Sequence, residues 1–130
     1  MTELVLHFDG ACQPNPGKGT WGWSIAGLPD RPVVTQFGVL PGTETNNTAE
    51  YVALGMGLRF LTEFLPRVRG GGRLVVSGDA KLVIGQVAGG SKCRQSRLRR
   101  LRDRVRHLAD RIRSRGFEIV WEWIPREQNG

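Results

Sequence analysis

The sequence has 130 residues, of which 39% are hydrophobic, and a formal net charge of +7. A chain of this length is expected to form one domain, residues 1–130, around a single core. It contains no apolar run of about 18 residues, which excludes a transmembrane helix. Its first residues show no signal-peptide pattern. The two cysteines, Cys12 and Cys93, form no CxxC pair, so we expect free thiols and a cytoplasmic protein.

The positive charge favours a polyanionic partner, with nucleic acid ahead of a membrane surface, and we expect no membrane partner. The charge is concentrated between residues 92 and 115, where only Asp103 and Asp110 oppose it. The basic residues of this segment are Lys92, Arg94, Arg97, Arg99, Arg100, Arg102, Arg104, Arg106, Arg111, Arg113 and Arg115.

Three strands are predicted in the first 40 residues. The segment "LVLHFDG" (4–10) alternates and then meets glycine, which predicts a strand ending at Asp9. The loop "ACQPNPGKG" separates it from a second strand, "TWGWSIAG" (20–27), and a turn leads to a third, "VVTQFGVL" (33–40). The short connections predict an antiparallel meander.

A helix is predicted from about residue 48 to residue 64. Its apolar positions follow helical spacing, and Pro66 ends it. Two glycines, Gly55 and Gly57, disfavour the helix by roughly 1 kcal/mol each. The apolar positions are Ala49, Val52, Ala53, Met56, Phe60 and Phe64.

The second half alternates strands and helices. The apolar run "RLVVSGD" (73–79) predicts a central strand covered on both faces, and "AKLVIGQVAG" (80–89) a short helix. Apolar residues between 98 and 112 recur at spacings of 3 and 4, which predicts an amphipathic basic helix. The segment "FEIVWEWI" (117–124) alternates as a fifth strand. The order β-β-β-α-β-α-α-β predicts an α/β domain with one five-stranded mixed sheet.

Four tryptophans lie in pairs on the second and fifth predicted strands. We interpret them as core residues, with base stacking as the alternative. They are Trp21, Trp23, Trp121 and Trp123.

Three carboxylates stand at informative positions. Asp9 ends the first strand, Asp79 ends the fourth, and Glu50 lies in the first turn of the long helix. If the two strands are parallel neighbours, Asp9 and Asp79 emerge at one edge, and a helix across that edge adds Glu50. Carboxylates that converge without a nearby lysine or arginine repel one another. A hard divalent cation, Mg²⁺ or Mn²⁺, relieves that repulsion.

Each carboxylate also fits a purely structural role. Asp9 precedes Gly10, and Asp-Gly is a common turn pair. Glu50 falls three residues after Asn47, the spacing of a capping box. Asp79 has the position of an N-cap.

Longer motifs change these interpretations. The segments "FDGACQPNPGKGTWGWSI", "TNNTAEYVALGMGL" and "SGDAKLVIGQVAG", in this order, resemble type 1 ribonuclease H. The segment "KCRQSRLRRLRDRV" resembles a helix of its shorter forms, which lack a separate basic protrusion, and "WIPREQN" resembles the last strand and turn. The resemblance covers nearly the whole chain. It implies a ribonuclease H-like fold and metal-dependent endonucleolytic cleavage of the RNA strand in RNA–DNA hybrids.

The resemblance also assigns the acidic residues. Asp9, Glu50 and Asp79 match catalytic, metal-binding residues that hold two Mg²⁺ or Mn²⁺ ions, with Asp9 bridging the ions and the other two holding mainly the leaving-group ion. The family has a fourth acid on a final helix, which falls beyond Gly130, so we expect this helix to be absent. Glu127 or Asn129 is a candidate substitute. The alternative is a hybrid-binding module with weak or no catalysis.

Substrate contacts follow from the same resemblance. Asparagine both donates and accepts hydrogen bonds, which suits recognition of 2′-hydroxyl groups across a shallow minor groove. Thr45 matches a DNA-phosphate contact, and a phosphate contact is expected at Lys81. The basic helix is predicted to track phosphates, with a solvated face as the alternative, and the protein to act as a monomer. The remaining candidate substrate-binding residues are Cys12, Gln13, Asn15, Asn46, Asn47, Lys92, Arg94 and Arg97.

Overall fold

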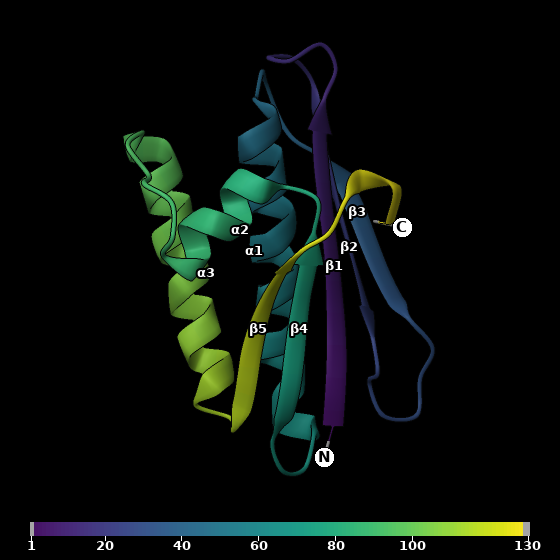
Figure 1. Cartoon of the computed structure of the whole chain (residues 1–130). Helices are drawn as coiled ribbons and strands as arrows, with labels where there is room; N and C mark the ends of the chain where they lie inside the picture. The colour runs from purple at the N-terminus through teal and green to yellow at the C-terminus, as the bar shows by residue number, and fades with distance from the viewer. Residues whose placement is uncertain (1, 129–130) are drawn as a thin grey trace.

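The computed structural model describes residues 2–128 and confirms the predicted order of strands and helices (Figure 1). Two single-turn 3₁₀ helices, η1 (Leu65–Arg67) and η2 (Arg126–Gln128), follow α1 and β5. The other elements are β1 (Thr2–Cys12), β2 (Gly19–Ala26), β3 (Val34–Val39), α1 (Asn46–Phe64), β4 (Gly72–Gly78), α2 (Lys81–Ala88), α3 (Ser96–Arg113) and β5 (Phe117–Trp123).

The five strands form one mixed sheet in the order β3-β2-β1-β4-β5. β1, β2 and β3 pair antiparallel, as the short loops predict, whereas β4 is parallel to both β1 and β5. In Figure 1, α1 crosses one face of the sheet, and α3 lies beside α1 beyond the edge strand β5. Among the described residues, no helix is both long and apolar enough to cross a membrane.

The core lies between the sheet and the helices, with α1 packed directly on the sheet. Alternate residues of β1, namely Leu4, Leu6 and Phe8, are buried. Most of the central strand β4 is buried on both faces, as its continuous apolar run predicts. α1 buries a broader surface than the predicted stripe, because it packs against both the sheet and α3. Its buried residues include Leu54, Leu58 and Leu61.

Two glycines of α1 have different surroundings. A Cβ at Gly57 would lie 2.8 Å from a methyl group of Leu6, so the missing side chain lets α1 pack closely on the sheet. A Cβ at Gly55 would meet no atom within 4 Å. The helix therefore has a packing reason for one glycine only.

The tryptophans are not all core residues. Trp23 is buried and packs against Phe60, with ring centroids 5.0 Å apart. Trp21 and Trp121 are partly buried. Trp123 is 46% exposed, because β5 is an edge strand and this residue is its last. The prediction of core packing is therefore wrong for Trp123.

The first strand does not end at Asp9. β1 continues to Cys12 because its pairing with β2 extends through Gly10↔Trp21 to Cys12↔Gly19. The Asp-Gly pair is thus not a turn. Gly10 has a different role, since a Cβ there would lie 2.3 Å from the carbonyl carbon of Ala49. This glycine permits direct backbone contact between β1 and α1.

The capping roles considered as structural alternatives for Glu50 and Asp79 do not occur. α1 begins at Asn46, and its N-cap is Thr45, whose hydroxyl accepts a hydrogen bond from the Thr48 N–H. Asn47 is therefore inside the helix, the capping box with Glu50 does not form, and Glu50 lies in the second turn. The N-cap of α2 is Ala80, with no side-chain hydrogen bond, so Asp79 is not its cap.

We expect Gly10→Ala to lower the free energy of unfolding by about 1–3 kcal/mol, because the added methyl group forces α1 away from β1. Gly55→Ala is the matched control and should raise it by about 0.5–1 kcal/mol, since alanine favours the helix and the space is open. Urea denaturation measures both changes. If Gly10→Ala were as stable as the wild type, the close backbone contact between β1 and α1 at this position would be contradicted.

Candidate active site

The paired strands β1 and β4 create the edge at which the acidic residues meet. Their parallel pairing ends at His7↔Ser77. Beyond this point β1 continues straight along β2, whereas the chain leaves β4 for α2. Asp9 and Asp79 each lie two residues past the last pair. The prediction that they emerge at the same edge is therefore confirmed.

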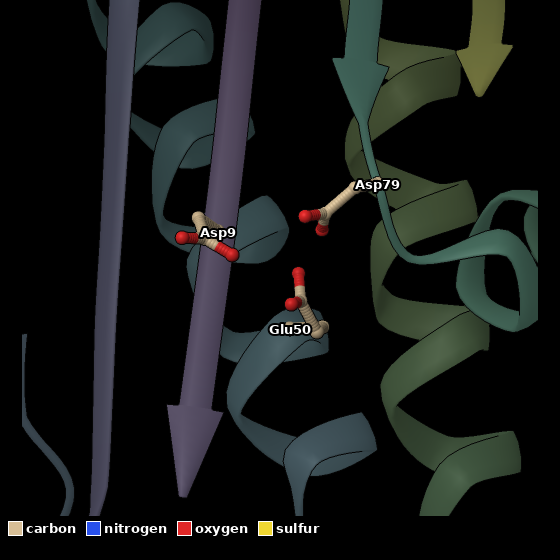
Figure 2. A group of neighbouring side chains, drawn as sticks. All are labelled: Asp9, Glu50 and Asp79. Atoms are coloured by element: carbon tan, nitrogen blue, oxygen red, sulfur yellow. The ribbon is translucent and has the colours of Figure 1, made fainter. Parts of the chain in front are cut away.

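The third carboxylate comes from α1. Gly10 lets the helix approach β1 at Ala49, and the next residue is Glu50. Carboxylate oxygens of Asp9, Glu50 and Asp79 lie within 4.8 Å of one another. Figure 2 shows the three side chains pointing toward a common space from β1, from α1 and from the segment after β4. The structure thus brings together all three predicted acids.

Burial and mutual repulsion disfavour ionisation of this group. Burial, together with the charges of Asp9 and Asp79, raises the pKa of Glu50 to about 8. Partial burial of its carboxylate, followed by the charge of Asp79, raises the pKa of Asp9 above its usual range. At neutral pH and without a cation, Glu50 therefore carries a proton.

The residues present fit a divalent cation. One oxygen of Glu50, Oε2, is buried and has no hydrogen-bond partner among the described residues. A buried acceptor without a donor is costly unless a cation or another donor reaches it. Three carboxylates offer the oxygen ligands that Mg²⁺ and Mn²⁺ prefer. Asp9, Glu50 and Asp79 are therefore the side chains able to hold the metal.

Beside the acids, hydrogen bonds join the end of β1 and the loop after it to the start of α1. The Cys12 N–H donates to the side-chain oxygen of Asn46 at 2.7 Å, and the Asn46 N–H donates to that of Asn15 at 3.0 Å. Both side chains are exposed, and their amide nitrogens donate to no atom of residues 2–128. Each asparagine thus keeps two free donors, whereas the Cys12 N–H is occupied.

Comparison with known proteins identifies the family. The family described as "Reverse transcriptase-like" matches residues 7–130. Ribonuclease H of Cupriavidus necator is 33% identical over 132 residues, which cover 100% of this chain and 86% of the relative. The chain belongs to the type 1 ribonuclease H family.

Solved ribonuclease H structures share the fold. The N-terminal RNase H domain of Rv2228c from Mycobacterium tuberculosis has a TM-score of 0.83 at 29% identity, covering 99% of this chain and 86% of that one. LC11-RNase H1, isolated from compost, was solved in complex with an RNA/DNA hybrid. It also has a TM-score of 0.83, at 26% identity, and the match covers 98% of this chain and 88% of that one. The chain spans 32% of the length of the whole bifunctional protein Rv2228c.

Two further residues contact Asp79, and neither was predicted from the sequence. The indole N–H of Trp123 donates to the Asp79 carbonyl oxygen at 3.2 Å. The Arg126 guanidinium lies 3.4 Å from the Asp79 carboxylate. A positively charged side chain does therefore lie beside the acids. Burial and the charge of Asp79 raise the pKa of Asp9, and the charge of Arg126 partly offsets that rise. The parallel placement of β5 beside β4 is the signal that could have located these residues.

Of the two predicted substitutes for a fourth acid, Glu127 does not join the group. Glu127 lies exposed in η2, and its carboxylate is not among the ligand atoms within 4.8 Å of one another. Its neighbour Arg126 reaches the acids instead. Asn129 lies outside the described residues. A substitute role for either residue remains a prediction.

The other predicted substrate residues lie around this edge. Thr45 caps α1, Gln13 is exposed in the loop after β1, and Asn47 is half-buried in the first turn of α1. Lys81 begins α2, with its ammonium group 5.5 Å from the ring centroid of Trp123. Lys81 therefore lies close to the acidic group.

The basic segment is divided between structural and free cations. Arg106 donates to the carbonyl oxygens of Gln86 and Val87 at the end of α2. Arg97 is paired with Glu44 through contacts of 2.6 Å. Arg102 is paired with Asp103, and Arg113 with Asp110. Within this segment, the exposed cations that form no ion pair with a described residue are Lys92, Arg94, Arg99, Arg100, Arg104, Arg111 and Arg115.

We predict that Glu50 makes the metal-free protein less stable as the pH rises. Between the ordinary glutamate pKa of 4.5 and about 8, the unfolded chain is ionised at this position while the folded protein holds a proton. The folded state therefore binds more protons, and its stability falls over this window. Glu50→Gln should reduce the slope and raise Tm at pH 8 by about 3–6 °C. Thermal unfolding with chelator at pH 5 and pH 8 measures this, and an unchanged slope would contradict it.

We predict that Arg126→Gln strengthens Mn²⁺ binding at pH 7, by about two- to fivefold, because a neighbouring exposed charge contributes up to about 1 kcal/mol. Titration calorimetry measures the affinity. Arg126→Lys, which keeps the charge, is the control and should bind as the wild type does. Weaker binding by Arg126→Gln would show instead that Arg126 orients Asp79 for the metal.

Proposed function

We propose that the chain is an endoribonuclease that cleaves the RNA strand of RNA–DNA hybrids with two divalent cations, Mg²⁺ or Mn²⁺. The observation that carries the proposal is the convergence of Asp9, Glu50 and Asp79 within 4.8 Å. Membership of the ribonuclease H family supports it, as does the RNA/DNA hybrid bound to LC11-RNase H1.

The three carboxylates are the proposed metal ligands. When bound, the cations supply an activated water and stabilise the departing oxygen of the phosphodiester. Glu50 must lose its proton for its buried Oε2 to act as a ligand, so metal loading is coupled to proton release. The indole N–H of Trp123 holds the Asp79 main chain, which limits movement of that ligand.

The loops beside the acids are the proposed reader of the RNA strand. Asn15 and Asn46 present amide donors next to the cluster, and a 2′-hydroxyl group can accept from them. Lys81 and the free cations of the basic segment are suited to phosphates. Binding should therefore weaken steeply with salt.

Location and oligomeric state follow as further proposals. Both cysteines are free and buried, which supports a reducing, cytoplasmic location. We propose that the protein acts as a monomer, because the three acids and the two asparagines all belong to one chain.

The second candidate is a hybrid-binding module with weak or no catalysis. Two observations favour it: the acidic group has three members among the described residues, and an arginine rather than Glu127 lies against it. The two functions share the same binding surface and differ only in cleavage.

Cleavage of a labelled RNA–DNA hybrid separates these functions. We expect cutting of the RNA strand with Mg²⁺ or Mn²⁺, none without metal, and a loss of at least about 100-fold in Asp9→Asn, because even outer-shell changes at metal sites cost up to about 100-fold. Salt-sensitive binding without cleavage by the wild type would establish the binding module. Absence of both would refute the two functions together.

A further inference from the structure

Glu44 is an unusual carboxylate for a surface expected to meet phosphates. Its side chain is only 8% exposed, although it lies in the loop before α1, close to Asn46. Both of its oxygens accept hydrogen bonds from Nη2 of Arg97, at 2.6 Å each. A buried carboxylate needs such a partner, because leaving it unpaired is strongly unfavourable.

The main chain of Glu44 joins the two loops beside the acids. Its carbonyl accepts from the Gly17 N–H at 2.9 Å, and its N–H donates to the Gly17 carbonyl at 2.7 Å. These bonds lie next to those linking Cys12, Asn46 and Asn15. The loop after β1 and the loop before α1 therefore form one hydrogen-bonded unit.

The other end of the ion pair is fixed by the core. Arg97 lies in the first turn of α3, and its neighbour Leu98 is buried in the main hydrophobic cluster. The backbone of Arg97 thus has a defined position. The Glu44–Arg97 pair connects the two-loop unit to this position, over 53 residues of sequence.

We propose that Arg97 is a positioning residue that neutralises Glu44 and holds the two loops so that Asn15 and Asn46 face the minor groove of a bound hybrid. This inference rests on the proposed function. It reassigns Arg97 from the phosphate contact that the sequence predicts. Without Arg97, the carboxylate of Glu44 would have to move toward water, which would displace the loops.

Hybrid binding and amide hydrogen exchange together test this role. The variants are Arg97→Gln, Glu44→Gln and the double variant, each compared in an Asp9→Asn background that cannot cleave the probe. The probe is a short RNA–DNA hybrid, and binding is measured across a range of salt concentrations. Exchange of the Cys12 and Asn46 N–H groups reports directly on the loop unit, with no need for substrate.

The positioning role predicts a specific pattern. Arg97→Gln should weaken binding by about tenfold, the equivalent of one hydrogen bond to a charged group. The salt dependence should stay unchanged, and exchange of both N–H groups should become faster. The double variant should restore affinity to within about threefold of its background, because two amides can pair without a buried charge.

Arg100→Gln is the matched control, since Arg100 is exposed on the same helix and has no ion pair among the described residues. As a phosphate contact, it should weaken binding, lower the salt slope by about one, and leave exchange unchanged. If Arg97→Gln behaves like this control, and the double variant restores nothing, the proposal is wrong.

The proposed function and the positioning role of Arg97 can be refuted separately. A wild-type protein that binds no hybrid would refute the proposed function and leave the exchange measurement to decide about the loops. Unchanged exchange in Arg97→Gln would then overturn the positioning role, and faster exchange would support the link between Arg97 and the loops.

Discussion

The direct backbone contact between β1 and α1 at Gly10 is the constraint on which the acidic site depends. A side chain at Gly10 would overlap the carbonyl group of Ala49, so only glycine allows α1 to lie this close. The contact places Glu50 beside the point where β1 and β4 separate. Three carboxylates are held together there by the fold, against their own repulsion. This arrangement can bind a cation, but in the metal-free protein the clustered carboxylates lower the stability of the fold.

Three carboxylates lie near the basic surface of the protein, and the charge of each is offset in a different way. Glu50 is buried deeply enough to hold a proton at neutral pH. Asp79 has Arg126 beside it. Glu44, away from the metal ligands, is paired with Arg97. Only Glu50 and Asp79 belong to the acidic site. There the proton on Glu50 and the charge of Arg126 reduce the repulsion among the carboxylates in the absence of a metal ion. The Glu44–Arg97 pair positions the loops and takes no part in metal binding.

Local patterns predicted the elements and their order, because each strand and helix has a clear period and clear breaks. These patterns do not predict strand ends or side-chain partners that are set by contacts between residues far apart in the sequence. Asp9-Gly10 has turn chemistry, yet pairing with β2 carries the strand through it. The place of Arg126 depends on β5 lying beside β4, and the engagement of Arg97 depends on Glu44, 53 residues away. The three acids were predictable because motif spacing and parallel strands both point to one edge.

The number of protons released when Mn²⁺ binds at pH 7 tests the protonation and metal-binding role of Glu50 most directly. Titration calorimetry in two buffers with different ionisation enthalpies measures that number. Since Glu50 is protonated without metal and must ionise to become a ligand, we expect release of about one proton from the wild type and almost none from Glu50→Gln. Binding of Mn²⁺ to the wild type without proton release would contradict the assignment of Glu50 as a buried, protonated carboxyl group that becomes a metal ligand.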